Sequence, residues 1–202
     1  MKKETYFYIT ALVAVLIVVL AGFIFINLDL TDYKYSVEKE GVRFASNSAQ
    51  PSELFNEMRN SKTFIISPQF VEIGPENTYM VSAITLFSTV LIAKDKDVIV
   101  VGRVLDETGN IIKCQTNLGD VRTNEELSIE KCNQLLSDNF NTRIFISFPA
   151  GEDSLIELEP RTIRITPSSF ENISHVSFVA VSALYEDAEQ IIDQVNIIVD
   201  QL

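Results

Sequence analysis

The chain has 202 residues and a formal net charge of −12, and hydrophobic residues make up 47% of it. This length and apolar content are typical of one globular domain of ordinary size and exclude a wholly disordered chain. The single histidine, His175, excludes HExxH zinc proteases and other sites that need two histidines. The seven glycines never lie closer than seven positions apart, which excludes a P-loop and a dinucleotide-binding glycine fingerprint.

Residues 5–28 form an uncharged, largely apolar run near the N-terminus. A helix rises about 1.5 Å per residue, so this run is long enough to cross a hydrocarbon core of about 30 Å. Lys2 and Lys3 precede the run, and two aspartates follow it. Because lysines mark the cytoplasmic side, the sequence predicts a single-pass cell-membrane anchor over residues 5–28. The N-terminus is then cytoplasmic, and everything after residue 28 lies outside the cytoplasm.

A cleaved signal peptide is the alternative interpretation of this run. The best small-residue cleavage candidate is the Val-Leu-Ala at 19–21, and the apolar run continues for seven residues beyond it. The apolar region of a signal peptide is about 7–15 residues long, so an uncleaved signal-anchor fits better.

Residues 77–93 form a second uncharged stretch, and Lys94 and Lys96 follow it. As a second span, this stretch would return the chain to the cytoplasm with lysines on the correct side. It is at the short limit for a span and carries five serines and threonines. We therefore expect a buried core helix here.

Beyond the anchor, hydrophobic periodicity and turn residues predict alternating strands and helices. In chain order the patterns predict a hairpin or extended stalk (33–44), a short helix from Pro51 to Met58, a strand (63–66), a helix (77–93), a strand (97–105), a turn (106–110), a returning strand (111–114), a helix (123–137), three strands (143–148, 154–158 and 161–165) and two helices (168–183 and 188–202). Strands between helices throughout favour a mixed α/β layer structure, one external domain over residues 29–202.

Some of these predictions rest on local signals. Pro68 is expected to end the strand at 63–66. Residues 97–105 are nearly all apolar on both faces, which predicts a central strand. Capping boxes at 123–126 and 168–171 are expected to start the helices that follow them. For residues 174–183 the pattern fits a strand as well as a helix, and we favour the helix.

Two further predicted segments, a strand and the final helix, have one apolar and one polar face. The strand at 161–165 is expected to place its two arginines on one face and its isoleucines on the other. In the final helix, apolar residues recur every three or four positions along one face. We expect that stripe, with Ile191, Ile192, Val195 and Val199, to dock on its own domain, so that Val195→Asp destabilises it.

Cys114 and Cys132 are the only cysteines. In a domain outside the cytoplasm, an even pair predicts a disulfide. Their spacing is not the CxxC spacing of redox-active sites, which indicates a structural bond. The geometry requires the helix that carries Cys132 to pack beside the strand that ends at Cys114.

The remaining candidates for chemistry are few. His175 would serve as a general base only with a serine or an acidic residue, and no recognised pattern places one near it. Asn172-Ile173-Ser174 is the one N-x-S/T sequon and makes Asn172 a candidate for glycosylation. Glu186, Asp187 and Glu189 cluster where a helix dipole favours negative charge, and no glycine-bearing calcium loop accompanies them. The sequence predicts no catalytic, metal-binding or cofactor-binding residue and no cofactor.

Charge and topology together limit the partners. Residues 29–202 carry 14 basic and 27 acidic side chains, a net charge of −13. This surface repels nucleic acid and anionic headgroups, so nucleic acid is not an expected partner. The sequence favours a non-enzymatic, membrane-anchored external domain that binds or assembles with an envelope protein, of unspecified oligomeric state. An envelope hydrolase that uses His175 with a serine or an acidic residue is the alternative.

Overall fold

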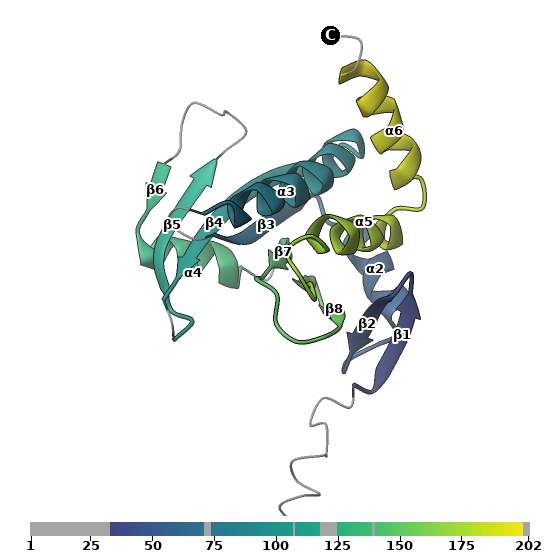
Figure 1. Ribbon diagram of the computed structural model, residues 1–202, viewed down its shortest axis with the longest axis horizontal. Helices are drawn as coiled ribbons and strands as arrows, with labels where there is room; N and C mark the ends of the chain where they lie inside the picture. The colour runs from purple at the N-terminus through teal and green to yellow at the C-terminus, as the bar shows by residue number, and fades with distance from the viewer. Residues whose placement is uncertain (1–32, 71–73, 107, 118–124, 139, 200–202) are drawn as a thin grey trace, which may run out of the picture. The chain divides into compact units, whose positions relative to one another are not determined.

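The structure is a computed structural model that describes residues 33–70, 74–106, 108–117, 125–138 and 140–199. In this part of the chain, nine strands form one sheet and five helices flank it (Figure 1). The strands are β1 (Tyr35–Lys39), β2 (Val42–Ser46), β3 (Thr63–Phe70), β4 (Asp97–Leu105), β5 (Ile111–Asn117), β6 (Glu125–Leu127), β7 (Thr142–Ile146), β8 (Ser154–Glu159) and β9 (Thr162–Thr166). The helices are α2 (Pro51–Arg59), α3 (Glu76–Ala93), α4 (Ile129–Ser137), α5 (Ile173–Leu184) and α6 (Ala188–Val199). The predicted mixed α/β fold is confirmed.

The strands lie in the order β1-β2-β8-β9-β7-β3-β4-β5-β6. The middle of the sheet is parallel, from β9 through β7 and β3 to β4. Both edges are antiparallel, with the β1–β2 hairpin at one edge and β4, β5 and β6 at the other. β3 and β4 are parallel strands joined by α3, as in a βαβ unit. The predicted hairpin forms, and Glu40 and Gly41 make its turn with φ values of 54° and 72°.

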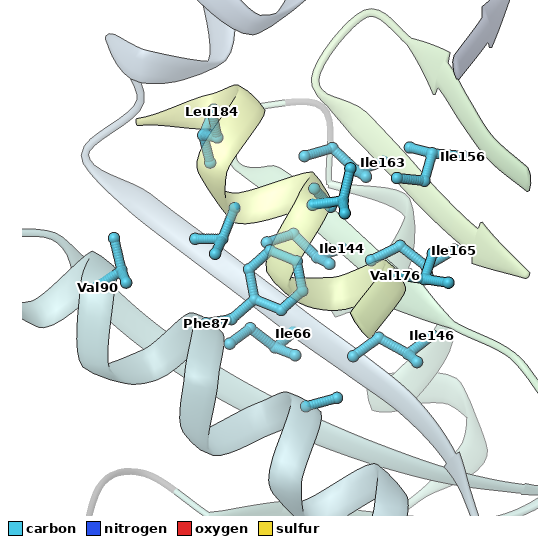
Figure 2. Close-up of a cluster of buried hydrophobic side chains, with 14 of the residues drawn as sticks. Ile66, Phe87, Val90, Ile144, Ile146, Ile156, Ile163, Ile165, Val176 and Leu184 are labelled. Atoms are coloured by element: carbon cyan, nitrogen blue, oxygen red, sulfur yellow. The ribbon is translucent and has the colours of Figure 1, made fainter. Parts of the chain in front are cut away.

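The main core lies between one face of the sheet and α2, α3 and α5. Alternate residues of the strands point into it, because successive side chains of a strand face opposite sides. Figure 2 shows Phe87 of α3 among the isoleucines of the sheet, close to Ile66 of β3 and Ile144 of β7. Leu54, Phe55 and Met58 of α2 are buried there too.

A second, smaller core lies on the opposite face, under α4. Ile65, Val101, Cys114 and Cys132 are its buried members, and Leu135 and Leu136 of α4 pack against them. α4 therefore covers this face where β3, β4 and β5 run. No residue of β2, β8 or β9 belongs to this second core in the part of the chain that the structure describes.

β3 continues past Pro68, so the prediction that the strand ends there is wrong. Pro68 pairs with Ile146 of the parallel neighbour β7. A proline has no N–H for the sheet ladder. On the β4 side, the Ser67 hydroxyl donates a hydrogen bond to the Val101 carbonyl over 2.9 Å and supplies a donor at this position. The side chain of Ser67 thus allows a proline inside an inner strand.

Both predicted capping boxes are wrong as helix starts. Residues 125–127 form β6, and α4 begins after Ser128, whose hydroxyl accepts a hydrogen bond from the Lys131 N–H. Residues 123 and 124 lie outside the described part. α5 begins at Ile173, and its N-cap, Asn172, makes no capping hydrogen bond with its side chain. The segment that also fitted a strand, residues 174–183, is helical as expected.

The predicted anchor at residues 5–28 lies outside the described residues, so it stays a prediction. Within the described ranges, none of the helices has the length and apolarity needed to span a membrane. The second uncharged stretch forms α3, whose buried residues include Met80, Phe87 and Leu91 on one side. It is therefore a core helix, as the sequence predicts.

α6 packs against α3 and α5. Ala188 is buried, and Ile191 and Ile192 are partly buried against the main core. The predicted docking of the final helix on its own domain is confirmed for these residues. The side chains of Val195 and Val199 lie outside the described ones.

Candidate functional site

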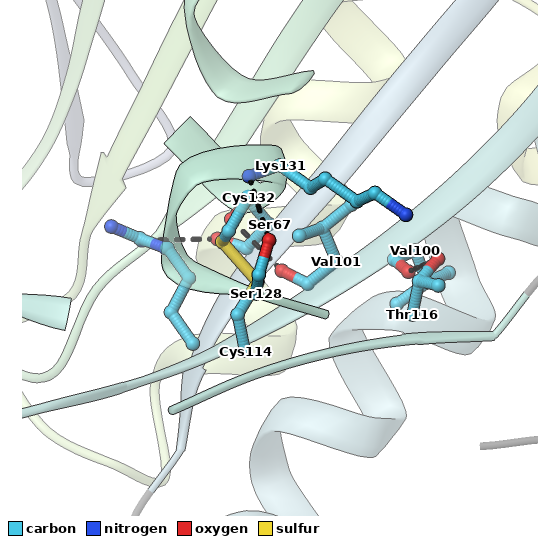
Figure 3. The surroundings of a disulfide bond; sticks show 9 residues. Ser67, Val100, Val101, Cys114, Thr116, Ser128, Lys131 and Cys132 are labelled. Carbon is cyan, nitrogen blue, oxygen red and sulfur yellow. Dashed lines mark hydrogen bonds between the residues drawn. A yellow bond between two sulfur atoms is a disulfide. The ribbon is translucent and has the colours of Figure 1, made fainter. Parts of the chain in front are cut away.

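The two cysteines are joined in the structure. Cys114 of β5 and Cys132 of α4 form a disulfide with Cα atoms 6.2 Å apart (Figure 3). Both residues are buried beside Val101, which places the bond inside the second core. The disulfide thus ties α4 to the antiparallel edge of the sheet, as the sequence-based geometry requires, and no cysteine of the described residues is left free.

His175 lies on the first turn of α5 and is exposed. Its Nε2 lies 3.1 Å from the backbone carbonyl oxygen of Glu40, in the β1–β2 turn. Among the described residues, no hydroxyl or carboxylate is hydrogen-bonded to its ring. The structure therefore gives His175 a contact with a turn and no nucleophile in hydrogen-bonding reach.

The other residues noted in the sequence stay apart from any assembled site. Asn172 is exposed, and its side-chain N–H donates to the Ser168 hydroxyl over 2.8 Å. Asp187 pairs with Lys94, and this hydrogen bond lowers the pKa of the Asp187 carboxyl. Within the described ranges, no three side chains of the metal-ligating types come together.

A different group of side chains lies on the sheet face opposite the main core, across β2, β8, β9 and β7. We call it the open face. The helices that pack on β2, β8 and β9 are α2 and α5, and both lie on the other side. Strand alternation and register place the following residues on the open face: Arg43, Ala45, Leu155, Glu157, Thr162, Arg164, Arg143 and Phe145, continued by Ser67 and Arg103.

Two arginines of the open face contact Phe145, and a third lies on the same strand. The guanidinium carbon of Arg103 lies 5.0 Å from the centre of the Phe145 ring, and that of Arg164 lies 4.9 Å from it. Both distances are within the range of cation–π attraction. Arg143 lies two residues before Phe145 on the same strand and side. The face thus concentrates positive charge in a chain whose net charge is −12.

Arg103 is the least compensated of these three. Its Nη2 donates to the Ser67 carbonyl oxygen over 3.1 Å, and its Nε is buried with no hydrogen-bond partner in the described structure. No ion pair to Arg103 is present among the described residues. Burial, and then the nearby charge of Arg164, lower the pKa of Arg103 from 12.5 to about 10. A desolvated cation without a counterion is energetically unfavourable and attracts an anion.

The neighbouring arginines have partners. Arg164 faces Glu159 in an exposed ion pair with an N–O distance of 3.7 Å. Arg143 donates to the Leu136 carbonyl oxygen over 3.0 Å and to the Thr162 hydroxyl over 2.8 Å, although its Nε is unpartnered. Arg143 thus helps to hold α4 on the sheet, whereas Arg103 is partly desolvated and Arg164 is exposed.

The sequence identifies only part of this group. The prediction that both arginines of 161–165 share a face is wrong, because Arg161 sits in the β8–β9 turn with a φ of 56°. Arg164 alone lies on the open face. Arg103 lies inside an apparently apolar central strand, where the hydrophobic pattern gives no reason to single it out. A charged residue in such a strand is the available signal, because a strand covered on both faces has no place for it.

One hollow lies on the opposite side of the sheet. It has a volume of about 490 Å³ and is lined by β1, Phe44 of β2, α2 and the end of α5, with Phe55 and Val37 among its apolar residues. Lys39, Arg59 and Glu186 give it charges of both signs. None of Cys114, Cys132, Asn172 and His175 lines this hollow.

Comparisons with protein-family models, with curated proteins and with solved structures give no match to this chain. The function has to be argued from the site itself.

Proposed function

We propose that this chain is a membrane-tethered domain outside the cytoplasm that binds, or assembles with, a protein partner of the cell envelope and catalyses no reaction. The observation that carries this proposal is the open face, where Arg103 stands half-buried beside Arg164 without a carboxylate of its own. The partner surface is therefore acidic where it meets this face.

The shape and coverage of the open face favour a macromolecular partner. The faces of a parallel sheet are normally both covered, and here α2, α3 and α5 lie on one side only. Leu155 and Phe145 add apolar surface between the charged side chains, and Leu155 is only half-buried. A mixture of arginine, aromatic and aliphatic residues is typical of protein interfaces.

Charge complementarity favours an acidic partner. A protein whose net charge is −12 is soluble but repels other acidic proteins at long range. An arginine cluster on such a surface attracts an acidic group only in one place and one orientation. Complementary charges of this kind contribute specificity and register more than raw affinity.

The location outside the cytoplasm is supported by two independent features. The apolar run at residues 5–28 with its preceding lysines is a sequence pattern of a single-pass anchor. The Cys114–Cys132 disulfide is of the kind that persists in oxidising compartments. The hydrolase alternative depends on His175, and the contact of that residue with the Glu40 carbonyl lends it no support.

Photo-crosslinking in cells tests the proposed function. A photoreactive amino acid at Leu155 of the open face is compared with one at Thr85, an exposed position of α3 on the other side of the sheet. We expect one discrete adduct from Leu155 and none from Thr85, and we expect acidic residues in the partner peptide that is crosslinked. An adduct from Thr85 alone, or a partner that meets Leu155 through a basic surface, would contradict the proposal.

A further inference from the structure

Two guanidinium groups approach one aromatic ring from opposite sides. Phe145 lies on β7, Arg164 comes from β9 on one side of it, and Arg103 comes from β4, across β3, on the other. Each charge lies about 5 Å from the ring centre, so the two are separated by no more than the sum of these distances. The Debye length is about 10 Å at 0.1 M salt, so salt screens charges at this separation only in part. The two positive charges therefore repel each other.

The ring holds the two arginines in place without neutralising them. A cation–π contact attracts each guanidinium through the negative face of the ring. It leaves the N–H groups at the edge of each guanidinium free to donate elsewhere. On Arg103 one of them donates to the Ser67 carbonyl, while the Nε–H has no acceptor.

In the cluster around Phe145, Arg164 forms an ion pair with Glu159. Glu159 pairs with it over 3.7 Å, and both side chains are about half exposed, so the pair is weak. Glu157 lies opposite Arg164 in the β8–β9 register and is half-buried. On the β7, β3 and β4 side of the ring, the described open-face residues are Arg143, Ser67 and Arg103, none of them acidic.

We propose that Arg103 and Arg164, held on either side of Phe145, form a binding site for a carboxylate group of an acidic protein segment. The guanidinium fork donates two parallel hydrogen bonds to a carboxylate, which gives both affinity and orientation. This inference rests on the proposed function, because it names the chemistry through which the open face holds its partner.

An acidic peptide fits this site better than an anionic lipid surface. The surrounding domain carries a net charge of −13 over residues 29–202, which repels an extended layer of negative charge. One or two carboxylates on a peptide reach the arginines without bringing such a layer close. The half-buried Leu155, on the same face, offers an apolar contact for the stem of a glutamate.

The test uses the full chain and an acetylated, amidated tetraglutamate peptide as the probe. The Nε–H signals of the arginines are followed by NMR during the titration, and binding constants are measured by calorimetry. We expect the Arg103 Nε–H signal to move most and to saturate. Arg103→Lys keeps the charge but loses the fork, and it should weaken binding at least about tenfold, the loss that removing a hydrogen bond to a charged group produces.

A second variant gives a result that misfolding cannot imitate. Glu159→Gln removes the carboxylate that competes for Arg164, so it should tighten peptide binding by a few fold. Lys62→Gln is the charge control, because it changes the net charge by one unit, the same size of change that Glu159→Gln makes, at a residue away from the site. Its side chain is 86% exposed at the opposite end of β3, and it should leave binding nearly unchanged.

Several outcomes would overturn the inference. In the NMR titration, the Arg103 signal would stay in place or all arginine signals would move equally. In calorimetry, Arg103→Lys and Glu159→Gln would both leave binding unchanged. Binding of inorganic phosphate with no binding of the peptide would assign the site to a small oxyanion instead. If the Leu155 crosslink persists while the peptide does not bind, the carboxylate site is wrong and the proposed function stands. If the peptide binds and Leu155 gives no adduct, the proposed function is wrong and the carboxylate site stands.

Discussion

Ser67 does with its side chain what a backbone N–H does at other positions of β3. Its hydroxyl is fully buried and donates to the Val101 carbonyl, next to a proline that cannot donate to the neighbouring strand. A buried carbonyl without a donor costs free energy comparable to a lost hydrogen bond. One hydroxyl therefore decides whether Pro68 is compatible with an inner strand.

Ser67→Ala should lower the free energy of unfolding by about 1–3 kcal/mol, because it leaves the buried Val101 carbonyl without its donor. Ser177→Ala is the matched control. The Ser177 hydroxyl is buried in α5 with no hydrogen-bond partner, so its removal should be neutral or stabilising. Urea unfolding of the two variants measures both effects. Equal destabilisation by both would show that the hydroxyl of Ser67 has no special role.

Asp106 gives a pH-dependent prediction for the β4–β5 turn. Its carboxylate accepts from the Thr108 hydroxyl over 2.7 Å and from the Asn110 N–H over 2.9 Å. These hydrogen bonds lower the pKa of Asp106 from 3.8 to about 2. A lowered folded-state pKa means that the stabilisation is fully present above about pH 4 and is lost as the pH falls through about 2.

Asp106→Ala should therefore be less stable than the parent chain at pH 6, and the gap in melting temperature should close between pH 4 and pH 2. Thermal unfolding at a series of pH values measures the gap, and NMR titration of the Asp106 carboxyl reports the pKa directly. A gap that stays constant down to pH 2 would contradict this role of the ionised carboxylate.

At the scale of elements, α4 depends on few contacts. It is a short helix, its one buried residue is Cys132, and it covers only part of a sheet face. The disulfide to β5 and the hydrogen bond from Arg143 to Leu136 fix it to two different strands. The loss of either attachment should loosen α4 before the main core is affected.

Cys114→Ser should lower the melting temperature, and the double variant with Cys132→Ser should be little worse than either single variant. A bond that closes a loop of this length contributes about 3 kcal/mol in the entropic account of disulfides, out of a typical domain stability of about 5–15 kcal/mol. Calorimetry of the oxidised chain, the reduced chain and the variants measures this contribution. Identical melting temperatures for all of them would contradict a structural role for the bond.

The sequence predicts the strongly periodic elements and misses features that depend on tertiary contacts. One of the two alternatives at 33–44 (the hairpin), the core helix over 77–93 and the central strand at 97–105 follow from local runs of apolar residues and the turns between them. The predicted starts of α4 and α5 fail because a capping box is a local pattern, and pairing with β5 takes residues 125–127 into the sheet. At these residues, pairing with a neighbouring strand overrides the local preference for a helix.

The candidate site shows the same limit. That Cys114 and Cys132 pair could be predicted from cysteine arithmetic, since only two are present. The association of Arg103 with Phe145 and Arg164 could not, because these residues lie on three strands brought together by the order β9-β7-β3-β4. The three residues are far apart in the sequence, so no local pattern reveals the cluster. It lies on the part of the sheet face that none of the described helices covers, where a ligand can reach it.

In the molecule as a whole, positive and negative charges are distributed unevenly. Residues 29–202 carry 27 acidic and 14 basic side chains, yet Arg43, Arg103, Arg143 and Arg164 share one sheet face. An acidic surface favours solubility, and in the proposed function the arginines select one approach for an acidic partner. In the proposed function, the anchor predicted over residues 5–28 tethers the domain to the membrane, where envelope proteins are its neighbours.

The location of the domain outside the cytoplasm is the central claim, and labelling of single exposed cysteines in intact cells tests it most directly. Lys62→Cys reports on the domain, because the Lys62 side chain is 86% exposed. Glu4→Cys reports on the N-terminus and keeps Lys2 and Lys3, which set the orientation. With a membrane-impermeant maleimide, we predict labelling at position 62 in intact cells and labelling at position 4 only after permeabilisation. Labelling at position 62 only after permeabilisation would contradict the account.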